Sequence, residues 1–173
     1  VSLLEDPSAT EEAKMTAIAL LRDLESLQPM KIYIRWQLTR QEKDDLKDHA
    51  VESLKAMGKE ALNAIESALD RANEYGQEAL LDALIGRRGG NKIFDLVLQF
   101  FQEKPEKRAV FADYLGKLGD MRALPVLKEA AMDPQVTYLD YIEIRNAIES
   151  LGGDCPERDF EEDEGYEALR QLQ

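Results

Sequence analysis

The chain has 173 residues, enough for one domain with a substantial core, and its composition of 44% hydrophobic and 33% charged residues suits a helix-rich globular protein. Its net charge of −13 argues against general nucleic-acid binding, which needs a basic field to displace counterions from phosphates. No apolar run approaches the roughly 20 residues that span a bilayer, and the single cysteine, Cys155, excludes an internal disulfide. We therefore expect a cytoplasmic protein that binds neither nucleic acid nor membranes.

The N-terminal part of the chain is expected to be helical. Ser8-Ala9-Thr10-Glu11 has the spacing of a capping box, which predicts a helix from about Ala9 to Pro29. Its apolar face comprises Ala17, Leu20, Leu21, Leu24 and Leu27. Residues 30–38 alternate between apolar and polar side chains as a strand does, but no other segment offers a partner strand. We interpret this stretch as a short helix with a wide buried face.

Four further helices are expected between residues 39 and 102. The capping-box spacing Thr39-Arg40-Gln41-Glu42 predicts the start of the first, which ends at Gly58. The apolar face of this first helix comprises Leu46, Ala50, Leu54 and Met57. The partner helix that follows Gly58 has Leu62, Ile65, Ala68 and Leu69 on its apolar face. A shorter helix follows over residues 77–87, with Ala79, Leu80, Ala83 and Leu84 on its apolar face. The fourth, residues 92–102 with Asn91 as its cap, is the most apolar of the chain.

Residues 108–133 predict two short helices joined at Gly119-Asp120. Gly119 suits a helix C-terminus because it tolerates positive φ, and Asp120 can accept from the free N–H groups that open the next helix. Proline at 134 ends the second helix, because it cannot continue the backbone hydrogen bonding. The two apolar faces comprise Val110, Phe111, Tyr114, Leu115 and Leu118, and then Ala123, Leu124, Leu127 and Ala131.

This two-helix segment resembles a HEAT repeat, and it is most similar to the HEAT-like type found in phycobilisome lyases. The residues that carry the resemblance are Arg108, Ala112, Leu115-Gly116, Leu118-Gly119-Asp120, Ala123-Leu124-Pro125, Leu127, Ala130 and Asp133-Pro134. The resemblance implies an all-α protein, a right-handed α-α superhelix (a HEAT-like solenoid) of about four to five helix pairs. Helix breaks near residues 28, 58, 89, 119 and 152 recur about every 31 residues, which supports a repeat array.

The remaining sequence comprises one more helix and an acidic tail. Residues 138–151 place Tyr141, Ile144, Ala147, Ile148 and Leu151 on one face. Residues 154–173 are crowded with Asp and Glu, which is typical of a solvated segment, although Tyr166 to Leu172 would suit a helix that caps the stack. We predict a repeat domain over residues 1–153 and a tail over residues 154–173.

No arrangement of residues predicts catalysis, a cofactor site or a metal site. His49 is the only histidine, and carboxylates surround Cys155, which disfavours a thiolate nucleophile. The loop GRRGGNK, with Arg87, Arg88 and Lys92, lacks the Gly-Lys-Ser/Thr ending of a phosphate-binding loop. We favour an inter-repeat turn with solvated cations there, with an anion site at the following helix N-terminus as the alternative.

The surface offers the remaining functional prediction. In HEAT arrays the second helices of the pairs line the concave side, and here their outward positions would form one mixed polar and acidic strip. The strip comprises Asn63, Ser67 and Asp70, then Asp95, Gln99 and Gln102, then Arg122, Lys128, Glu129 and Met132. Such a strip suits recognition of a protein segment, and a basic partner would suit its charge; ordinary solvated surface is the equally weighted alternative.

We therefore expect a non-catalytic protein–protein interaction scaffold or adaptor that binds its partner on the concave surface. The first alternative is an enzyme-associated role of the bilin lyase type, which would need a deep apolar cavity containing His49 or Cys155. A HEAT-like DNA glycosylase is less favoured, because it would need a basic groove. A structural or regulatory end of a longer protein is the remaining alternative.

Overall fold

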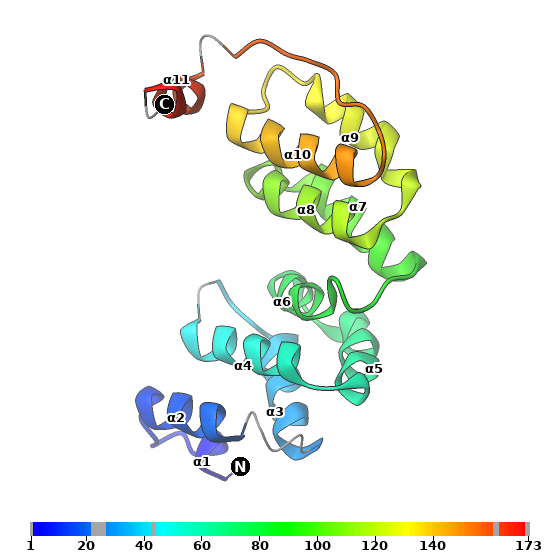
Figure 1. Cartoon of the computed structure of the whole chain (residues 1–173). Helices are drawn as coiled ribbons and strands as arrows, with labels where there is room; N and C mark the ends of the chain where they lie inside the picture. The colour runs from blue at the N-terminus through cyan, green and yellow to red at the C-terminus, as the bar shows by residue number, and fades with distance from the viewer. Residues whose placement is uncertain (1, 22–26, 43, 161–162, 172–173) are drawn as a thin grey trace. The chain divides into compact units, whose positions relative to one another are not determined.

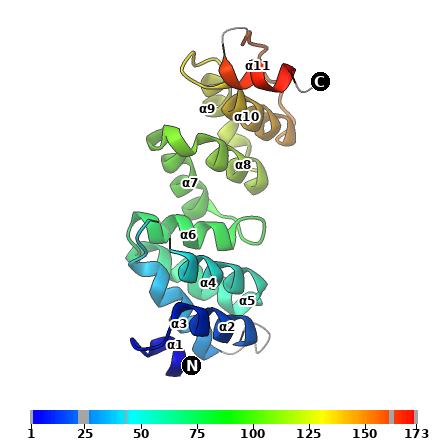
Figure 2. The same cartoon turned by 90° about the vertical axis from the view of Figure 1, so that its left-hand side faces the viewer.

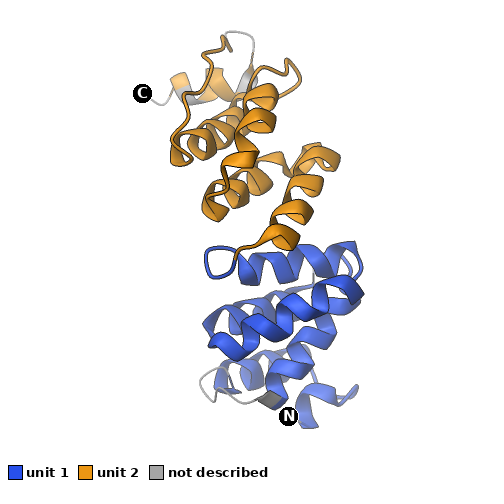
Figure 3. Cartoon of the chain, turned by 90° about the vertical axis from the view of Figure 1, so that its right-hand side faces the viewer, with its two compact units in different colours: residues 1–88 blue, residues 89–173 orange. Residues whose placement is uncertain are grey.

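The protein is all-α in a computed structural model that describes residues 2–21, 27–42, 44–160 and 163–171; no strand occurs in these ranges. The chain divides into two compact units, residues 1–88 (unit 1) and residues 89–173 (unit 2), shown in different colours in Figure 3. Within the described ranges, no helix has the length and apolar character needed to cross a bilayer. The all-α class is confirmed, whereas the right-handed superhelix and the boundary at residue 153 stay predictions.

Unit 1 is a stack of helices around one core. Its elements are α1 (Ser2–Glu5), α2 (Glu11–Leu21), α3 (Leu27–Leu38), α4 (Asp45–Ala56), α5 (Lys59–Ala68), the 3-10 turn η2 (Leu69–Arg71) and α6 (Glu74–Leu84). Helix α4 packs against α2, α3 and α6, and α3 also packs against α5 and α6 (Figures 1 and 2). The apolar residues expected on α5 and α6 are all buried.

The start of α2 differs from the prediction. Thr10 caps the helix by accepting from the backbone N–H of Ala13, while Ser8 donates to Asp6 in the preceding turn. The buried face is also displaced, because Ile18 is 1% exposed and Leu20 is 72% exposed. Leu20 was therefore wrongly assigned to the core, and Leu24 lies outside the described residues.

Two further helix starts in unit 1 also differ. Helix α3 begins at Leu27 and contains Pro29 in its first turn, where a missing N–H costs no intrahelical bond. Proline therefore lies at the beginning of α3 and does not end α2. Helix α4 is capped by Asp44, which accepts from Lys47 N at 3.1 Å, so the predicted box at Thr39 is wrong.

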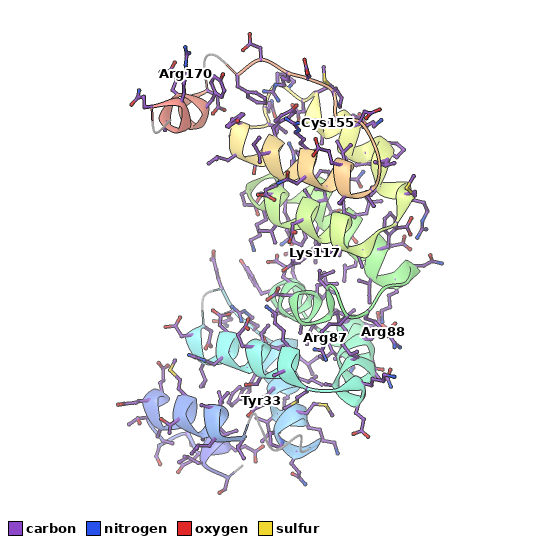
Figure 4. The ribbon with its side chains drawn as sticks, in the orientation of Figure 1. Tyr33, Arg87, Arg88, Lys117, Cys155 and Arg170 are labelled. Atoms are coloured by element: carbon purple, nitrogen blue, oxygen red, sulfur yellow. The ribbon has the colours of Figure 1, made fainter. Side chains whose placement is uncertain are left out.

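Residues 30–38, whose pattern alternates like that of a strand, are helical as predicted. Met30, Ile32, Tyr33 and Ile34 are at most 7% exposed, which gives α3 the wide buried face expected of it. Tyr33 and Gln37, one turn apart, are completely buried. The position of Tyr33 beneath α4 is labelled in Figure 4.

Unit 2 contains the two-helix segment that the sequence predicted best. Its elements are α7 (Asn91–Glu103), η3 (Pro105–Lys107), α8 (Arg108–Leu118), η4 (Met121–Ala123), α9 (Leu124–Ala131), α10 (Tyr138–Ser150) and α11 (Glu164–Arg170). Gly119 has φ of 70° at the end of α8, and the Asp120 carboxylate accepts from Arg122 N at 3.0 Å, so the predicted junction is confirmed. Val110 is 47% exposed, because the inner face of α8 turns away from it.

Helix α10 packs along α8 and also contacts α9, and α7 packs on α8. The close α8–α10 approach depends on Gly116, where a Cβ atom would lie 2.9 Å from Ser150 Oγ. The cap of α7 is Gly90, with φ of 130°, and not Asn91 as predicted. Instead the Asn91 side chain accepts from the Arg122 guanidinium at 2.9 Å, which joins the starts of α7 and η4.

The first part of the acidic tail, residues 154–160, forms a strap that packs on unit 2. Phe160 is 6% exposed, with its ring 5.2 Å from that of Tyr138 and 4.8 Å from that of Tyr141. Arg158 donates to backbone carbonyls of residues 133 and 134, just beyond α9. The acidic side chains at positions 154, 157 and 159 are exposed, as expected of a solvated tail, whereas the burial of Phe160 in an aromatic site was not expected.

A hydroxyl on α10 also holds the strap. Tyr141 is 5% exposed and donates to the carbonyl oxygen of Pro156 at 2.9 Å. Burial, followed by a hydrogen bond with Cys155, raises the pKa of Tyr141 to about 12. The phenol therefore stays protonated at neutral pH and remains a donor to the strap.

Candidate functional site

The predicted strip is distributed over both units, and its unit 1 members take part in local hydrogen bonds. Asn63 and Ser67 lie exposed on α5, and Asp70 lies exposed in η2. The Ser67 hydroxyl donates to the Asn63 carbonyl at 2.8 Å, and Asn63 Oδ1 accepts from Arg88 at 3.2 Å. Asn63 and Ser67 therefore make hydrogen bonds within unit 1.

Three members of the strip in unit 2 line one pocket. Gln102 comes from the end of α7, and Glu129 and Met132 come from α9 and the residue after it. The pocket has a volume of about 420 Å³ and is completed by Phe101, Arg108, Val126, Ala130 and Asp133. The strip residues Asp95, Gln99, Arg122 and Lys128 do not line this pocket.

The period of α9 explains how one short helix supplies most of this pocket. Val126, Glu129 and Ala130 follow the spacing i, i+3 and i+4, which places them on one side of α9, and Met132 and Asp133 follow directly after the helix. Phe101 is 2% exposed at the base of the pocket. The pocket therefore combines an apolar base with polar side chains along α9.

An ion pair joins two sides of the pocket. Arg108 Nη1, on the first residue of α8, lies 3.3 Å from Asp133 Oδ2, just beyond α9, and both side chains are mostly buried. Asp133 Oδ1 also accepts from the backbone N–H of Gln135 at 2.9 Å. Arg108 Nε is buried without an acceptor among the described residues. Arg108 and Asp133 lie near the two ends of the segment that resembles a HEAT repeat, and their opposite charges are the feature of the sequence that could have predicted this pair.

The rim of the pocket is exposed and chemically available. Gln102 and Glu129 are exposed, and their side chains make no hydrogen bond or ion pair with any residue that the structure describes. Met132 is 53% exposed at the same rim. The arrangement offers an amide, an uncompensated carboxylate and an adaptable apolar surface to an incoming group.

Arg122, in contrast, connects two elements of unit 2. Its guanidinium donates to Asp120 and to Asn91, and it lies 4.2 Å from the centre of the Phe94 ring. The hydrogen bond with Arg122 lowers the pKa of Asp120 below its ordinary value. Arg122 therefore joins α7 to η4, which accounts for its place on the surface without a partner protein.

The arginines of the loop at residues 86–91 are also engaged within unit 1 (Figure 4). Arg87 donates to the carbonyl oxygens of Leu54, at 3.0 Å, and Met57, both at the end of α4. Arg88 Nε lies 2.9 Å from a Glu66 carboxylate oxygen on α5. The anion site that was the alternative for Arg87, Arg88 and Lys92 stays a prediction, with Lys92 in unit 2.

The residues considered for catalysis lie outside the pocket. His49 is exposed on α4. Cys155 is half-buried in the strap, with its sulfur 3.6 Å from the Pro156 carbonyl oxygen. A second pocket of about 470 Å³, between residues 134–137 and the tail, contains neither residue. No group of three His, Cys, Asp or Glu side chains in the described part of the chain could hold a metal ion.

Comparison with known proteins finds similarity in one segment. Residues 107–131 match the model of the PBS lyase HEAT-like repeat. Neither the curated proteins nor the solved structures contain a significant match to the chain. The matching segment covers α8 and α9 and includes Arg108, Val126, Glu129 and Ala130 of the pocket. The chain thus contains a segment similar to the PBS lyase HEAT-like repeat, and this segment forms much of the pocket.

Proposed function

We propose that the protein is a helical repeat scaffold that binds another protein and has no catalysis of its own. The observation that carries this proposal is the pocket of unit 2, which Gln102, Glu129 and Met132 from the predicted strip line together and to which the HEAT-like segment contributes Glu129. Its rim offers hydrogen-bonding groups and negative charge on rigid helices, which suits recognition of a polypeptide.

An affinity capture with two charge-matched variants tests the scaffold proposal. The first variant carries Asp70→Lys, Asp95→Lys and Glu129→Lys on the strip. The second carries Glu12→Lys, Glu106→Lys and Glu167→Lys at other exposed acids, so its net charge changes equally. Each is used as bait in a lysate of the source organism, and a captured protein is then purified and titrated against the purified chain.

We expect a protein that binds the wild type and the control variant and that loses affinity for the strip variant, with unchanged circular dichroism in all three. Equal binding to both variants would place the interaction elsewhere on the chain. If no captured protein binds directly in purified form, the scaffold function is wrong.

An enzyme-associated role of the bilin lyase type is the second candidate. Its support is the similarity of residues 107–131 to the PBS lyase HEAT-like repeat. Neither His49 nor Cys155 lines the pocket of unit 2 or the pocket beside residues 134–137. Binding of a bilin to the purified chain, observed by its absorption spectrum, would favour this candidate over the scaffold.

A further inference from the structure

We propose that the pocket of unit 2 binds a protein segment in which an apolar side chain lies next to a lysine or arginine. This inference rests on the proposed scaffold function and specifies both the site and the chemistry of the partner. The apolar side chain would enter between α7 and α9, and the cation would meet Glu129 at the rim.

The base of the pocket supplies the apolar part of this recognition. Phe101, Val126 and Ala130 present a ring and two small aliphatic groups there, and Met132 adds a thioether at the rim. The volume of about 420 Å³ lies within the range of about 300–1,000 Å³ that is usual for ligand pockets. Met132 has an unbranched side chain that can adjust to the shape of the inserted group.

The exposure of the rim favours a polypeptide over a small molecule. Small-molecule sites commonly enclose most of the ligand surface, whereas here Gln102, Glu129 and Met132 are all exposed. A polypeptide needs only one side chain in the pocket and leaves its backbone at the rim. The Gln102 amide can both donate to and accept from that backbone.

The charges around the pocket favour a cation beside the apolar group. Arg108 compensates Asp133, whereas the Glu129 carboxylate makes no ion pair with any residue in the described part of the chain. The residues three and four positions from Glu129 are Pro125 and Val126 on α9 and Met132 and Asp133 just beyond it, and none of them is basic. A lysine or arginine of the partner would therefore supply the missing charge, and an arginine would bind in bidentate geometry.

Methyl NMR of the 173-residue chain provides the test, with two methionines as matched reporters. Met132 lies at the pocket rim, and Met121 is 60% exposed in η4 of the same unit and outside the pocket. Three pools of short peptides serve as probes, with Leu-Lys, Leu-Glu or Ala-Lys at the centre of otherwise random sequence. We expect the Leu-Lys pool to shift the Met132 methyl signal at lower concentration than either control pool, with Met121 unchanged.

Variants of the protein separate the two parts of the recognition. Glu129→Lys should weaken binding of the Leu-Lys pool about fivefold to tenfold, since it replaces attraction by repulsion, while Glu167→Lys in α11 should leave binding unchanged. Ala130→Leu should reduce binding of the Leu-Lys pool by filling the pocket. Met121 shifts that match the wild type confirm that each variant is folded.

Three results would overturn the inference. Equal effects of the Leu-Lys and Leu-Glu pools on Met132 would remove the role of the cation. A Met132 shift that depends on protein concentration alone would assign the pocket to a second copy of the chain. If no pool shifts Met132 although a captured protein binds in the affinity experiment, the pocket is not the docking site and the scaffold function stands; if that experiment also fails, both proposals fail.

Discussion

At the scale of single residues, several charged side chains that the sequence would place on the surface make hydrogen bonds between helices distant in the sequence. Arg87 is the clearest case, because its guanidinium donates to the carbonyl oxygens of Leu54 and Met57 at the end of α4. The Leu54 oxygen also accepts from the backbone N–H of Met57, at the C-cap of that helix. Arg122 and Arg108 act similarly between α7 and η4, and between α8 and the end of α9. Local sequence patterns do not predict such hydrogen bonds, since the partners of each arginine lie tens of residues away.

Substitution of the two adjacent arginines tests this distinction. Arg87→Ala should lower the free energy of unfolding by about 1–3 kcal/mol, because it removes the guanidinium that donates to the Leu54 and Met57 carbonyl oxygens. Arg88→Ala removes an exposed ion pair with Glu66 and should cost about 1 kcal/mol or less. Urea unfolding followed by the fluorescence of Trp36, the single tryptophan, measures both values, and equal losses would contradict the assignment of Arg87 as a helix cap.

At the scale of elements, apolar spacing identified the helices well and local capping motifs located their starts poorly. Helix α3 was predicted because residues 30–38 had no partner strand, although their apolar residues alternate, and the α8–α9 segment was predicted at its junction. Both capping boxes failed, because Thr10 and Asp44 lie nearer to the first helical turn than the predicted caps do. Several Ser, Thr and Asp side chains compete for this role, and the position of the folded helix selects among them.

The packing of the strap could not be predicted from the composition of its sequence. Eight acidic residues dominate the region from 154 to 167, and their density predicts solvation. Phe160 and Arg158 nevertheless bind it to α10 and to the end of α9. The ring of Phe160 is therefore buried against α10, although the acidic side chains of the strap favour contact with water.

Removal of that aromatic anchor should release the strap. Phe160→Ala should lower the unfolding free energy by about 3 kcal/mol, the lower end of the range for buried phenylalanine. It should also make residues 154–160 accessible to limited proteolysis under native conditions. Glu157→Ala, at an exposed position of the same strap, is the control and should change neither measurement. Resistance of the Phe160 variant to the protease would show that other contacts hold the strap.

At the scale of the whole molecule, the chain consists of two compact units of similar length. Close helix contacts at glycine organise each of them. In unit 1 a Cβ atom at Gly76 would lie 1.6 Å from the backbone oxygen of Gln37, so α6 can approach the end of α3 only without a side chain there. Gly116 serves the α8–α10 contact in unit 2.

Gly76→Ala should therefore destabilise unit 1 selectively. We expect a loss of about 3 kcal/mol, high in the range for overpacking, since backbone and not a flexible side chain must move. Trp36 fluorescence reports on unit 1 and the Met121 methyl signal on unit 2, so the first transition should shift to lower urea and the second should not. Gly89→Ala, where no atom lies within 4 Å of the added Cβ, is the control. A common shift of both signals would show that the chain unfolds as one cooperative unit.

The sequence by itself determined the helical class, most helix pairs and the HEAT-like segment, because these follow from local periodicity and from glycine and proline at the breaks. It also named three residues of the pocket rim, Gln102, Glu129 and Met132, through their outward positions on helices. Tertiary structure alone decided that Phe101 and Arg108 complete that pocket, that Arg122 joins α7 to η4, and that Phe160 is buried. These outcomes depend on contacts between residues distant in sequence, whose geometry exists only once the helices have packed.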